Sequence, residues 1–392
     1  MEKHDSIQNR EHPESGILNR IRQTDFSLDS VAEAFPELNL LRGVPQNPLY
    51  HGEGDVWQHT RLVCRQVTAL NQWQTLSPLE QELLFLAAAF HDIGKPGCTR
   101  LEDGAWTSPR HTIVGEQVFR AMAYRQQARF GLTWDQRELV AKLIRYHGLP
   151  VWFLKKRRPE ADLIRAAECL PLKLLYLLSK SDVAGRLNQA AEDQESTVEL
   201  FGEYAEELGI WDHGYGFADP FTRYEYFHRK DLWQGSRLYD DTTFDVWLMA
   251  GLPLAGKDTW IQQHGNGLPV ISLDQIREEY GISPKKDSSR VVQIAVRQAR
   301  EYLRKQQPFI WNATNLILKN RERLCGLFSA YHARIQLIYL EAPYEELLLR
   351  NKKRPRSIPV PVLEHMIDHM EMPDPWETHS RRLQIQKFYK LR

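Results

Sequence analysis

Apolar residues recur at helical spacing through roughly the first 210 positions of the chain. Between Val56 and Trp73 they fall every three or four residues, which is the period of one helix face. Ser77 followed by Pro78 is typical of a helix start, because serine caps free backbone N–H groups and proline fits the first helical turn. Asp103-Gly104, between two extended flanks, is a hairpin turn signal. The pattern predicts a mostly α-helical first part with one small β-hairpin.

The pattern changes near residue 243, where short β-rich runs begin to alternate with helical stretches. The predicted strands are DVWLMAG, LPVISL, PFIWNA and IQLIYLEA. Alternation of this kind is typical of a parallel sheet flanked by helices, with right-handed crossovers. We therefore expect a multidomain protein of the α and α/β classes, with at least four strands in its second part.

These changes of pattern divide the chain into four parts. We expect a polar tail at 1–15, a helical domain at 16–210, a connector at 211–242 and an α/β domain at 243–392.

Eight aromatic residues lie between Trp211 and Trp233, in the connector. They could stack on nucleobases. The more general role of such residues is to pack a segment against a folded domain, and we favour that interpretation.

Composition and charge narrow the class of protein. The 392 residues include 51 Lys+Arg and 51 Asp+Glu, and this zero net charge, taken alone, argues against a general polyanion binder. Residues 1–240, however, hold 28 basic and 34 acidic residues, a net charge of −6, and residues 241–392 hold 23 and 17, a net charge of +6. Most of the basic excess lies in 350–356 and 381–392, which are either solvated surface or contacts to phosphate or nucleic acid.

The longest wholly apolar run, Leu83 to Phe90, is too short for a membrane helix, and the polar N-terminus lacks the apolar core of a signal peptide. The four cysteines are scattered and form no C-x-x-C pair, as in proteins of a reducing compartment. We expect a cytoplasmic protein with no membrane partner.

The helical part contains an ordered series of imidazoles and carboxylates: His59, His91, Asp92, His111, His147 and Asp182. A single histidine on an apolar helix is more often a core or surface residue than a ligand. The adjacent pair His91-Asp92 changes that view, because it follows the apolar run LLFLAAAF and a buried aspartate is costly unless it is paired or bound to metal. Mixed imidazole and carboxylate ligands suit Mn, Fe, Co, Ni or Zn better than calcium.

This order of residues, with GDVWQHT around His59 and HDIGK from His91, resembles the HD-domain metal-dependent phosphohydrolases. It is most similar to the HD modules appended to tRNA nucleotidyltransferases, and the resemblance covers about residues 45–190. It implies that His59, His91, Asp92 and Asp182 are the core metal ligands. His111 and His147 match the extra histidines of members with two metals, or they contact phosphate, so that one or two ions are expected.

The ligands indicate the chemistry. A metal polarises phosphoryl oxygens and lowers the pKa of a bound water, which provides hydroxide near neutral pH. Lys95, four residues after His91, can neutralise a non-bridging oxygen as a catalytic residue, or it is a surface lysine. Arg100 and Arg110 flank the predicted hairpin and are candidates for binding the substrate phosphate.

The second part carries a G-x-x-x-x-G-K motif from Gly251 to Lys257, directly after a predicted strand and at the start of a helix. Glycines permit a tight nest of backbone N–H groups around phosphates, and the lysine reaches the terminal pair. We therefore predict that Gly251, Gly256 and Lys257 bind a nucleoside triphosphate. The position that usually holds magnesium through Ser or Thr is Asp258, followed by Thr259, and either of the two could hold the ion.

Two further groups point to an acceptor. Asp274 follows the strand LPVIS at the edge where ligands bind parallel sheets, and it can take a proton from an attacking hydroxyl or cap the next helix. Arg277 can then clamp an acceptor phosphate. Arg350 and Arg354 are spaced to share one helix face, as a lid over the donor phosphates or as a solvated basic helix.

The phosphate loop, D-x-x-R, PFIWNATN and R-x-x-x-R before I-P together resemble the kinase domain of polynucleotide 5′-hydroxyl kinases over about 245–375. In that family the aspartate matching Asp274 is the general base, the arginine matching Arg277 binds the acceptor phosphate, and lid arginines hold the donor.

An HD phosphohydrolase followed by such a kinase resembles the bacterial HD-Pnk family of end-healing enzymes. The resemblance implies a 2′,3′-phosphatase and an NTP-dependent 5′-hydroxyl kinase that prepare RNA ends, with DNA as a further candidate, for a ligase. It also implies magnesium or manganese with ATP or GTP in the kinase.

Two alternatives use the same motifs. One is a small-molecule nucleotide kinase fused to a nucleotidase or phosphodiesterase, against which the basic C-terminal runs and Arg277 argue only modestly. The other is a signalling protein whose HD domain senses a nucleotide without cleaving it, against which the intact His91-Asp92 pair with Asp182 argues.

Overall fold

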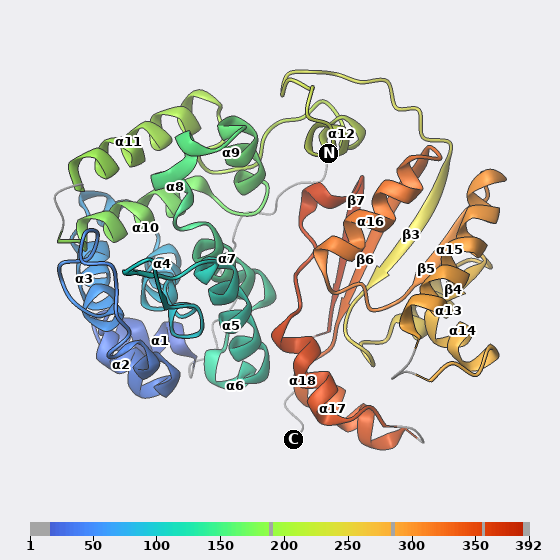
Figure 1. Ribbon diagram of the computed structural model, residues 1–392, viewed down its shortest axis with the longest axis horizontal. Helices are drawn as coiled ribbons and strands as arrows, with labels where there is room; N and C mark the ends of the chain where they lie inside the picture. Colours follow the sequence, from blue (N-terminus) through green and yellow to red (C-terminus); the bar gives the residue numbers. More distant parts are fainter. Residues whose placement is uncertain (1–15, 188–190, 284–286, 355–356, 387–392) are drawn as a thin grey trace. The chain divides into compact units, whose positions relative to one another are not determined.

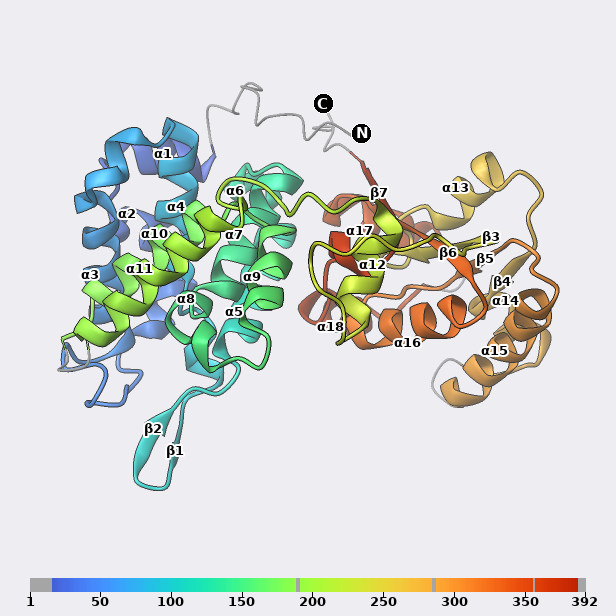
Figure 2. The same cartoon turned by 90° about the horizontal axis from the view of Figure 1, so that it is seen from above.

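The computed structural model describes residues 16–187, 191–283, 287–354 and 357–386. They form two compact units (Figures 1 and 2). The first takes in the described residues up to Pro159 together with Leu170–His213, and the second takes in Glu160–Cys169 and the described residues from Gly214 onward. The expected polar tail at 1–15 and the last basic residues, 387–392, lie outside the described residues, as do the final two residues of the basic run 350–356.

The first unit is helical, with a single two-stranded antiparallel sheet among its described residues, and this confirms the predicted fold class. Its α-helices are α1 (Ile17–Gln23), α2 (Leu28–Ala34), α3 (Val56–Ala69), α4 (Pro78–Phe90), α5 (His111–Arg125), α6 (Gln127–Phe130), α7 (Trp134–Tyr146), α8 (Leu149–Trp152), α10 (Leu172–Ala184) and α11 (Ala191–Glu207). Short 3-10 turns are η1 (Pro36–Leu41), η2 (Asn71–Thr75), η3 (Lys95–Gly97) and η4 (Phe153–Lys155), and the hairpin is β1 (Arg100–Glu102) with β2 (Ala105–Thr107).

Helix α4 is the apolar centre of this unit. Ser77 caps it in a reciprocal capping box with Glu80, with Pro78 at the first position, as the sequence predicted. Every residue from Leu83 to Phe90 is buried, and α4 packs against α3, α7 and α10. The helix therefore delivers its following residues, His91 and Asp92, into the interior.

A buried ion cluster joins α5 to α7, the two helices that carry His111 and His147 at their ends. Arg120 on α5 is fully buried and donates to Glu116 at 2.6 Å and to Glu138 of α7 at 2.9 Å. Breaking such a network is costly because it would leave a charge unpaired in the interior. The cluster thus fixes the two histidine-bearing helices against each other.

The second unit is built on a five-stranded parallel sheet with the order β4-β5-β3-β6-β7 and helices on both faces (Figures 1 and 2). Its strands are β3 (Phe244–Ala250), β4 (Val270–Ser272), β5 (Phe309–Asn312), β6 (Ala333–Glu341) and β7 (Ser380–Ile385). Its helices are α9 (Pro159–Ala167), α12 (Pro220–His228), α13 (Lys257–His264), α14 (Leu273–Glu279), α15 (Ser288–Arg304), α16 (Leu318–Ser329), α17 (Tyr344–Lys353) and α18 (Val360–Asp368), with a 3-10 turn η5 (Pro375–Glu377).

The four strands predicted from the sequence are β3 to β6, and the parallel α/β prediction is confirmed. The fifth strand, β7, has the sequence SRRLQI, includes the start of the basic run at Arg381 and pairs with β6. Among the described residues, no helix combines the length and apolarity that a bilayer span requires.

The aromatic residues of the connector pack mainly against their neighbours in the second unit. Phe217 lies 5.2 Å from Tyr226 between ring centroids, and Tyr224 stacks on His379 at 4.2 Å. These rings therefore pack against the folded protein, as the sequence analysis favoured. Trp233 differs, because its side chain is 66% exposed.

Arg321 of α16 positions the loop that follows β5. It is fully buried, pairs with Glu377 at 2.6 Å and donates to the carbonyl of Asn315 at 3.0 Å. The Asn315 side chain in turn donates to the carbonyl of Met249 at 2.6 Å, at the end of β3. One buried guanidinium thus supports the place where β3 enters the phosphate loop.

We expect Arg321→Ala to destabilise the second unit by about 3–5 kcal/mol, because it leaves Glu377 buried without its partner. Arg323→Ala, at an exposed position of the same helix, is the matched control. Urea unfolding followed by circular dichroism measures both. Equal unfolding midpoints for the two variants would contradict this account of Arg321.

Candidate functional site

The six predicted metal-site residues of the first unit come together from five helices. His59 lies in the first turn of α3, His111 is the first residue of α5, and Asp182 lies in the last turn of α10. His91 with Asp92, and His147, follow the ends of α4 and α7 directly. Their ligand atoms form two groups, each within 4.8 Å: His59, His91 and Asp182 in one, and Asp92, His111 and His147 in the other.

Three of the histidines are oriented in the same way. In His91, His111 and His147 the ring Nδ1 lies 2.7, 2.8 and 2.9 Å from the carbonyl oxygen of the residue three positions earlier. A carbonyl oxygen can only accept, so each Nδ1 carries the hydrogen and each neutral ring has its Nε2 lone pair free to bind a metal.

The carboxylates complete the donor set. Asp182 lies 2.9 Å from His59 Nε2, and Asp92 lies 3.2 Å from His91 Nε2 and 3.6 Å from His111 Nε2. Among the described residues, neither oxygen of Asp92 nor Nε2 of His91 has a hydrogen bond of normal geometry, although all three atoms are buried. Buried acceptors without regular hydrogen bonds fit a bound divalent cation.

The pKa values of His111, His147 and Asp92 favour the ligand forms of these three groups. Burial, with a contribution from His91, lowers the pKa of His147 to about 3, and burial also lowers the pKa of His111. Burial alone would raise the pKa of Asp92, but Lys95 and His91 outweigh it and hold that pKa well below its usual value. Near pH 7 His111 and His147 are neutral and Asp92 is charged, as metal binding requires. His59 differs, because burial would lower its pKa but hydrogen bonds with Asp182 and Glu53 outweigh burial and raise that pKa.

Lys95 belongs to this site and is not a surface lysine. Its side chain is 9% exposed, and its Nζ lies 2.7 Å from Asp92 and donates to Gln46 Oε1 at 2.7 Å. A buried ammonium beside the candidate ligands can pair with a non-bridging phosphate oxygen.

The two arginines near the hairpin differ. Arg100 is exposed on β1 and pairs with Glu102 at 2.8 Å, so the structure does not bring its side chain to the metal cluster. Arg110 is exposed directly before His111, has a positive φ of 62°, and has no ion pair among the described residues.

Sequence reasoning missed Glu53. This carboxylate is 1% exposed, and its Oε1 lies 2.8 Å from both His51 Nδ1 and His59 Nδ1, while Oε2 accepts from the backbone N–H of Leu187 at 3.0 Å. A carboxylate behind a ligating histidine fixes the ring and raises its basicity. The available signal was the position of Glu53 six residues before His59, in the same motif-bearing segment.

In the second unit the phosphate loop connects β3 to α13. Gly251 has a φ of +136°, and a Cβ there would lie 2.3 Å from the carbonyl oxygen of Leu340, so no other residue fits. Gly256, with a φ of +100°, precedes the first residue of α13. Lys257 Nζ donates to the carbonyls of Gly251 and Leu252 at 3.0 and 2.9 Å, which folds its side chain back over the loop.

Burial lowers the pKa of Lys257 to about 8, although Asp258 and Asp274 oppose this shift. Asp258 and Thr259 are both exposed, and the Asp258 carboxylate accepts from the side chain of Asn312, at the end of β5, at 2.7 Å. Asn312, which the sequence analysis did not single out, therefore orients the carboxylate at the position where magnesium is expected.

Asp274 does not cap α14, because the Ser272 hydroxyl accepts from the backbone N–H of Gln275. Its carboxylate is exposed in the first turn of that helix and acts electrostatically on Lys257. Arg277 donates to Ser288 Oγ at 3.2 Å, and its Nη1 is buried without a partner in the part of the chain that the structure describes.

Arg350 lies against the phosphate loop. It donates to the Leu254 carbonyl, Gln386 and Glu346, each at 2.8 Å. The prediction that Arg354 shares its helix face is wrong: α17 ends at Lys353 and Arg354 is extended, with a ψ of 140°. The next residue is a proline, and the residue before proline is pushed out of the helical region.

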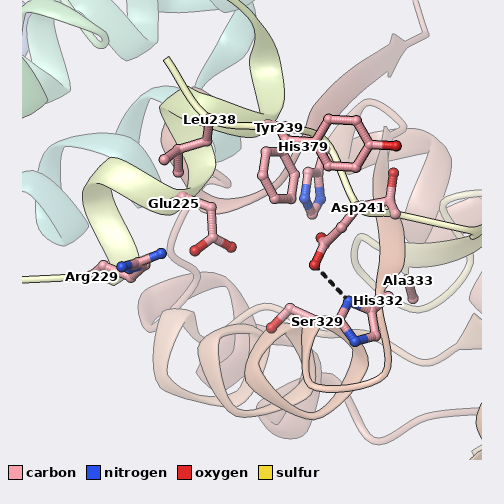
Figure 3. A pocket seen from close by; sticks show the side chains of 11 residues that line it. Glu225, Arg229, Leu238, Tyr239, Asp241, Ser329, His332, Ala333 and His379 are labelled. Atoms are coloured by element: carbon pink, nitrogen blue, oxygen red, sulfur yellow. Dashed lines mark hydrogen bonds and ion pairs between the residues drawn. The ribbon is translucent and has the colours of Figure 1, made fainter. Parts of the chain in front are cut away.

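A cavity of about 230 Å³ lies elsewhere in the second unit (Figure 3). It is lined by residues of α12, of the segment before β3, of α16 and of the start of β6, and an Asp241–His332 pair at 2.8 Å borders it. Because these residues precede β3 and β6, the cavity is at the opposite end of the strands from the phosphate loop and is separate from it.

Family models match both units. The HD domain model matches residues 55–170, and a model described as an AAA domain matches residues 246–373. The chain therefore combines a helical HD domain with an α/β, P-loop kinase-like domain.

Relatives match parts of the chain. The Multifunctional CCA protein of Hahella chejuensis is 36% identical over 25% of this chain and 21% of its own length, and that of Vibrio campbellii is 26% identical over 50% and 40%. The CC-adding tRNA nucleotidyltransferase of Thermus thermophilus is 32% identical over 44% and 36%. The chain spans at most 40% of the length of these three relatives. A solved structure of a kinase candidate from Chloroflexus aurantiacus covers 37% of this chain and 86% of its own, at 21% identity and a TM-score of 0.31.

We expect Glu53→Gln to weaken binding of a divalent transition metal about 10- to 100-fold, because the neutral amide no longer holds His59 as a charged acceptor does. Competition with a chromophoric chelator measures the affinity. Glu206→Gln, exposed on α11, is the control. Unchanged affinity in the Glu53 variant would show that this carboxylate does not support the centre.

Proposed function

We propose that the chain is a bifunctional nucleic-acid end-healing enzyme. Its HD domain would remove a 2′- or 3′-phosphate, and its P-loop domain would transfer a phosphoryl group from a nucleoside triphosphate to a 5′-hydroxyl. The observation that carries the proposal is the presence in one chain of a His/Asp cluster beside Lys95 and a phosphate loop beside Asp274. The two chemistries would restore both ends of a broken strand, as the resemblance to the HD-Pnk family suggests.

In the HD domain the donor set fits a transition metal such as Mn, Fe, Co, Ni or Zn, held by His59, His91, Asp92 and Asp182. When bound, such a metal supplies a Lewis acid and a hydroxide near neutral pH. Lys95 would pair with a phosphate oxygen while its contact to Asp92 keeps that carboxylate charged. His111 and His147, whose Nε2 lone pairs are free, would hold a second ion; a direct contact to the phosphate would require Nε2 to carry a proton.

In the kinase domain the loop from Gly251 to Gly256 would hold the phosphates of ATP or GTP with magnesium or manganese. Lys257 would leave the carbonyls of Gly251 and Leu252 and pair with the terminal phosphates. Asp274 would accept the proton of the 5′-hydroxyl as its oxygen attacks the terminal phosphorus and the nucleoside diphosphate leaves.

The arginines and Asp258 would position the two substrates. Arg277 has a free nitrogen for the acceptor phosphate, and Arg350 already lies at the loop that would hold the donor. Asp258, oriented by Asn312, is the better-positioned candidate to hold the magnesium ion, directly or through water.

Three observations support a polymer as the substrate. Residues 241–392 have a net charge of +6 and contain the phosphate loop. Arg277 lies three residues beyond the candidate base and has a nitrogen to spare. One of the relatives is named a CC-adding tRNA nucleotidyltransferase, so its named substrate is an RNA. RNA is therefore the substrate we propose first, with DNA as a second test, and an RNA ligase is the class of enzyme that would use the product.

We expect Asp92→Ala to lower phosphate release from a 3′-phosphorylated RNA at least about 100-fold, because it removes a charged ligand and leaves Lys95 without its partner. Released inorganic phosphate measures the rate, and kinase activity on a 5′-hydroxyl strand checks that the chain is folded. Retention of phosphatase activity would refute the metal assignment.

We expect Asp274→Ala to lower transfer of labelled phosphate from ATP to a 5′-hydroxyl oligonucleotide about 10²- to 10⁴-fold, the usual loss when a general base is removed. Glu278→Gln, exposed on the same helix, should leave the transfer rate within about twofold, as expected for a charge outside the site. If Asp274→Ala transfers label as fast as the Glu278 variant, the kinase chemistry assigned here is wrong.

A further inference from the structure

The segment that follows His147 exposes apolar side chains beside the metal centre. Within α8 and η4, Val151 and Phe153 are buried, and Phe153 packs on Phe201 with ring centroids 5.6 Å apart. The alternate residues Trp152 and Leu154 face outward, 38% and 55% exposed. Two large apolar side chains are thus exposed on a segment that Val151 and Phe153 anchor in the core.

The same segment carries the densest group of cations in the first unit, Lys155 to Arg158. Lys155 Nζ lies 4.4 Å from the centre of the Trp152 ring, so the charge and the aromatic surface form one feature. Lys156 and Arg157 are exposed and have no ion pair among the described residues. This group stands out because residues 1–240 have a net charge of −6.

The segment begins at the metal centre. Trp152 is the fifth residue after His147 and is reached through Gly148 and the short helix α8. A Cβ on Gly148, the residue next to His147, would lie 3.8 Å from Trp152 Cδ1, so the indole rests against the backbone of the site.

We propose that Trp152, Lys155, Lys156 and Arg157 form a platform for the single-stranded RNA that carries the terminal phosphate. A base near the 3′ end stacks on the open part of Trp152, and the preceding phosphates pair with the three cations. Stacking on an aromatic ring together with backbone contacts is how single strands are bound without regard to sequence. This inference rests on the proposed phosphatase and adds the residues that select a polymer over a mononucleotide.

An RNA strand fits this surface better than a membrane does. The exposed apolar area is limited to two side chains on about two short turns, whereas a membrane-binding helix presents a long apolar face. The segment also follows His147 of the site to which we assign the phosphatase.

The test compares two substrates of the full-length, metal-loaded protein: a ten-nucleotide RNA with a 3′-phosphate, and a nucleoside 3′-monophosphate. For Trp152→Ala and for the double variant Lys156→Glu with Arg157→Glu, we expect KM for the RNA to rise about tenfold or more. The kcat/KM for the mononucleotide should stay within about twofold, because it does not reach the platform. For the double variant the salt dependence of RNA binding should fall by about 1.4 in log–log slope, since two phosphate contacts are lost.

Matched controls are Trp233→Ala, an exposed tryptophan of the second unit, and Arg65→Glu, exposed on α3. Both should match wild type on both substrates. The platform is refuted if the Trp152 and Lys156/Arg157 variants process RNA like wild type, or if they lose RNA and mononucleotide hydrolysis equally. Binding of wild type, but not the double variant, to phosphatidylserine vesicles without any change in RNA kinetics would also refute it and assign the surface to a membrane. If wild type hydrolyses neither substrate, it is the proposed phosphatase that fails.

Discussion

In three histidines of the first unit, a hydrogen bond from the ring Nδ1 to the carbonyl three residues earlier decides which nitrogen faces the interior. Two of these histidines directly follow the ends of α4 and α7, where carbonyls have no partner within the helix. The same bond therefore satisfies a helix end and fixes the ring. The free Nε2 atoms are brought together by the packing of α4 and by the ion cluster between α5 and α7. The charged Asp92 lies beside two of them.

In the second unit, the ends of strands bring the residues of the candidate site together. The parallel strands leave their carboxyl ends at one edge of the sheet, so Gly251, Asn312 and Ser272 meet there although they are far apart in sequence. The backbone N–H of Gly251 donates to the carbonyl of Thr314, in the loop after β5, at 2.9 Å. Arg321 donates to the carbonyl of Asn315 in the same loop. The phosphate loop thus depends on a buried ion pair, Arg321 with Glu377, that lies outside the loop itself.

The parts that the sequence predicted well are those written in local patterns. The helical period and the strand–helix alternation predicted the fold class. The order of histidines and aspartates identified six residues that the structure brings together in two groups, each with its ligand atoms within 4.8 Å. The sequence did not predict contacts that form only on folding. These are the contact of Glu53 with His59 Nδ1 and the hydrogen bond from Asn312 to Asp258. Two local details were also not predicted. Strand β7 forms at the start of a basic run, and α17 ends at Lys353, one residue before Arg354, which precedes a proline. A charge pattern alone does not distinguish a solvated run from an edge strand.

The zero net charge of the chain conceals two parts with opposite charges, −6 before residue 241 and +6 after it, each with its own phosphate chemistry. Our central claim is that both act on the ends of one RNA. The most direct measurement offers the wild-type protein, with metal and ATP, an RNA bearing a 5′-hydroxyl and a 3′-phosphate in competition with an equimolar set of mononucleotides, and follows both RNA ends by mass spectrometry. The account predicts that the RNA gains a 5′-phosphate and loses its 3′-phosphate before the mononucleotides change; consumption of the mononucleotides first would contradict it.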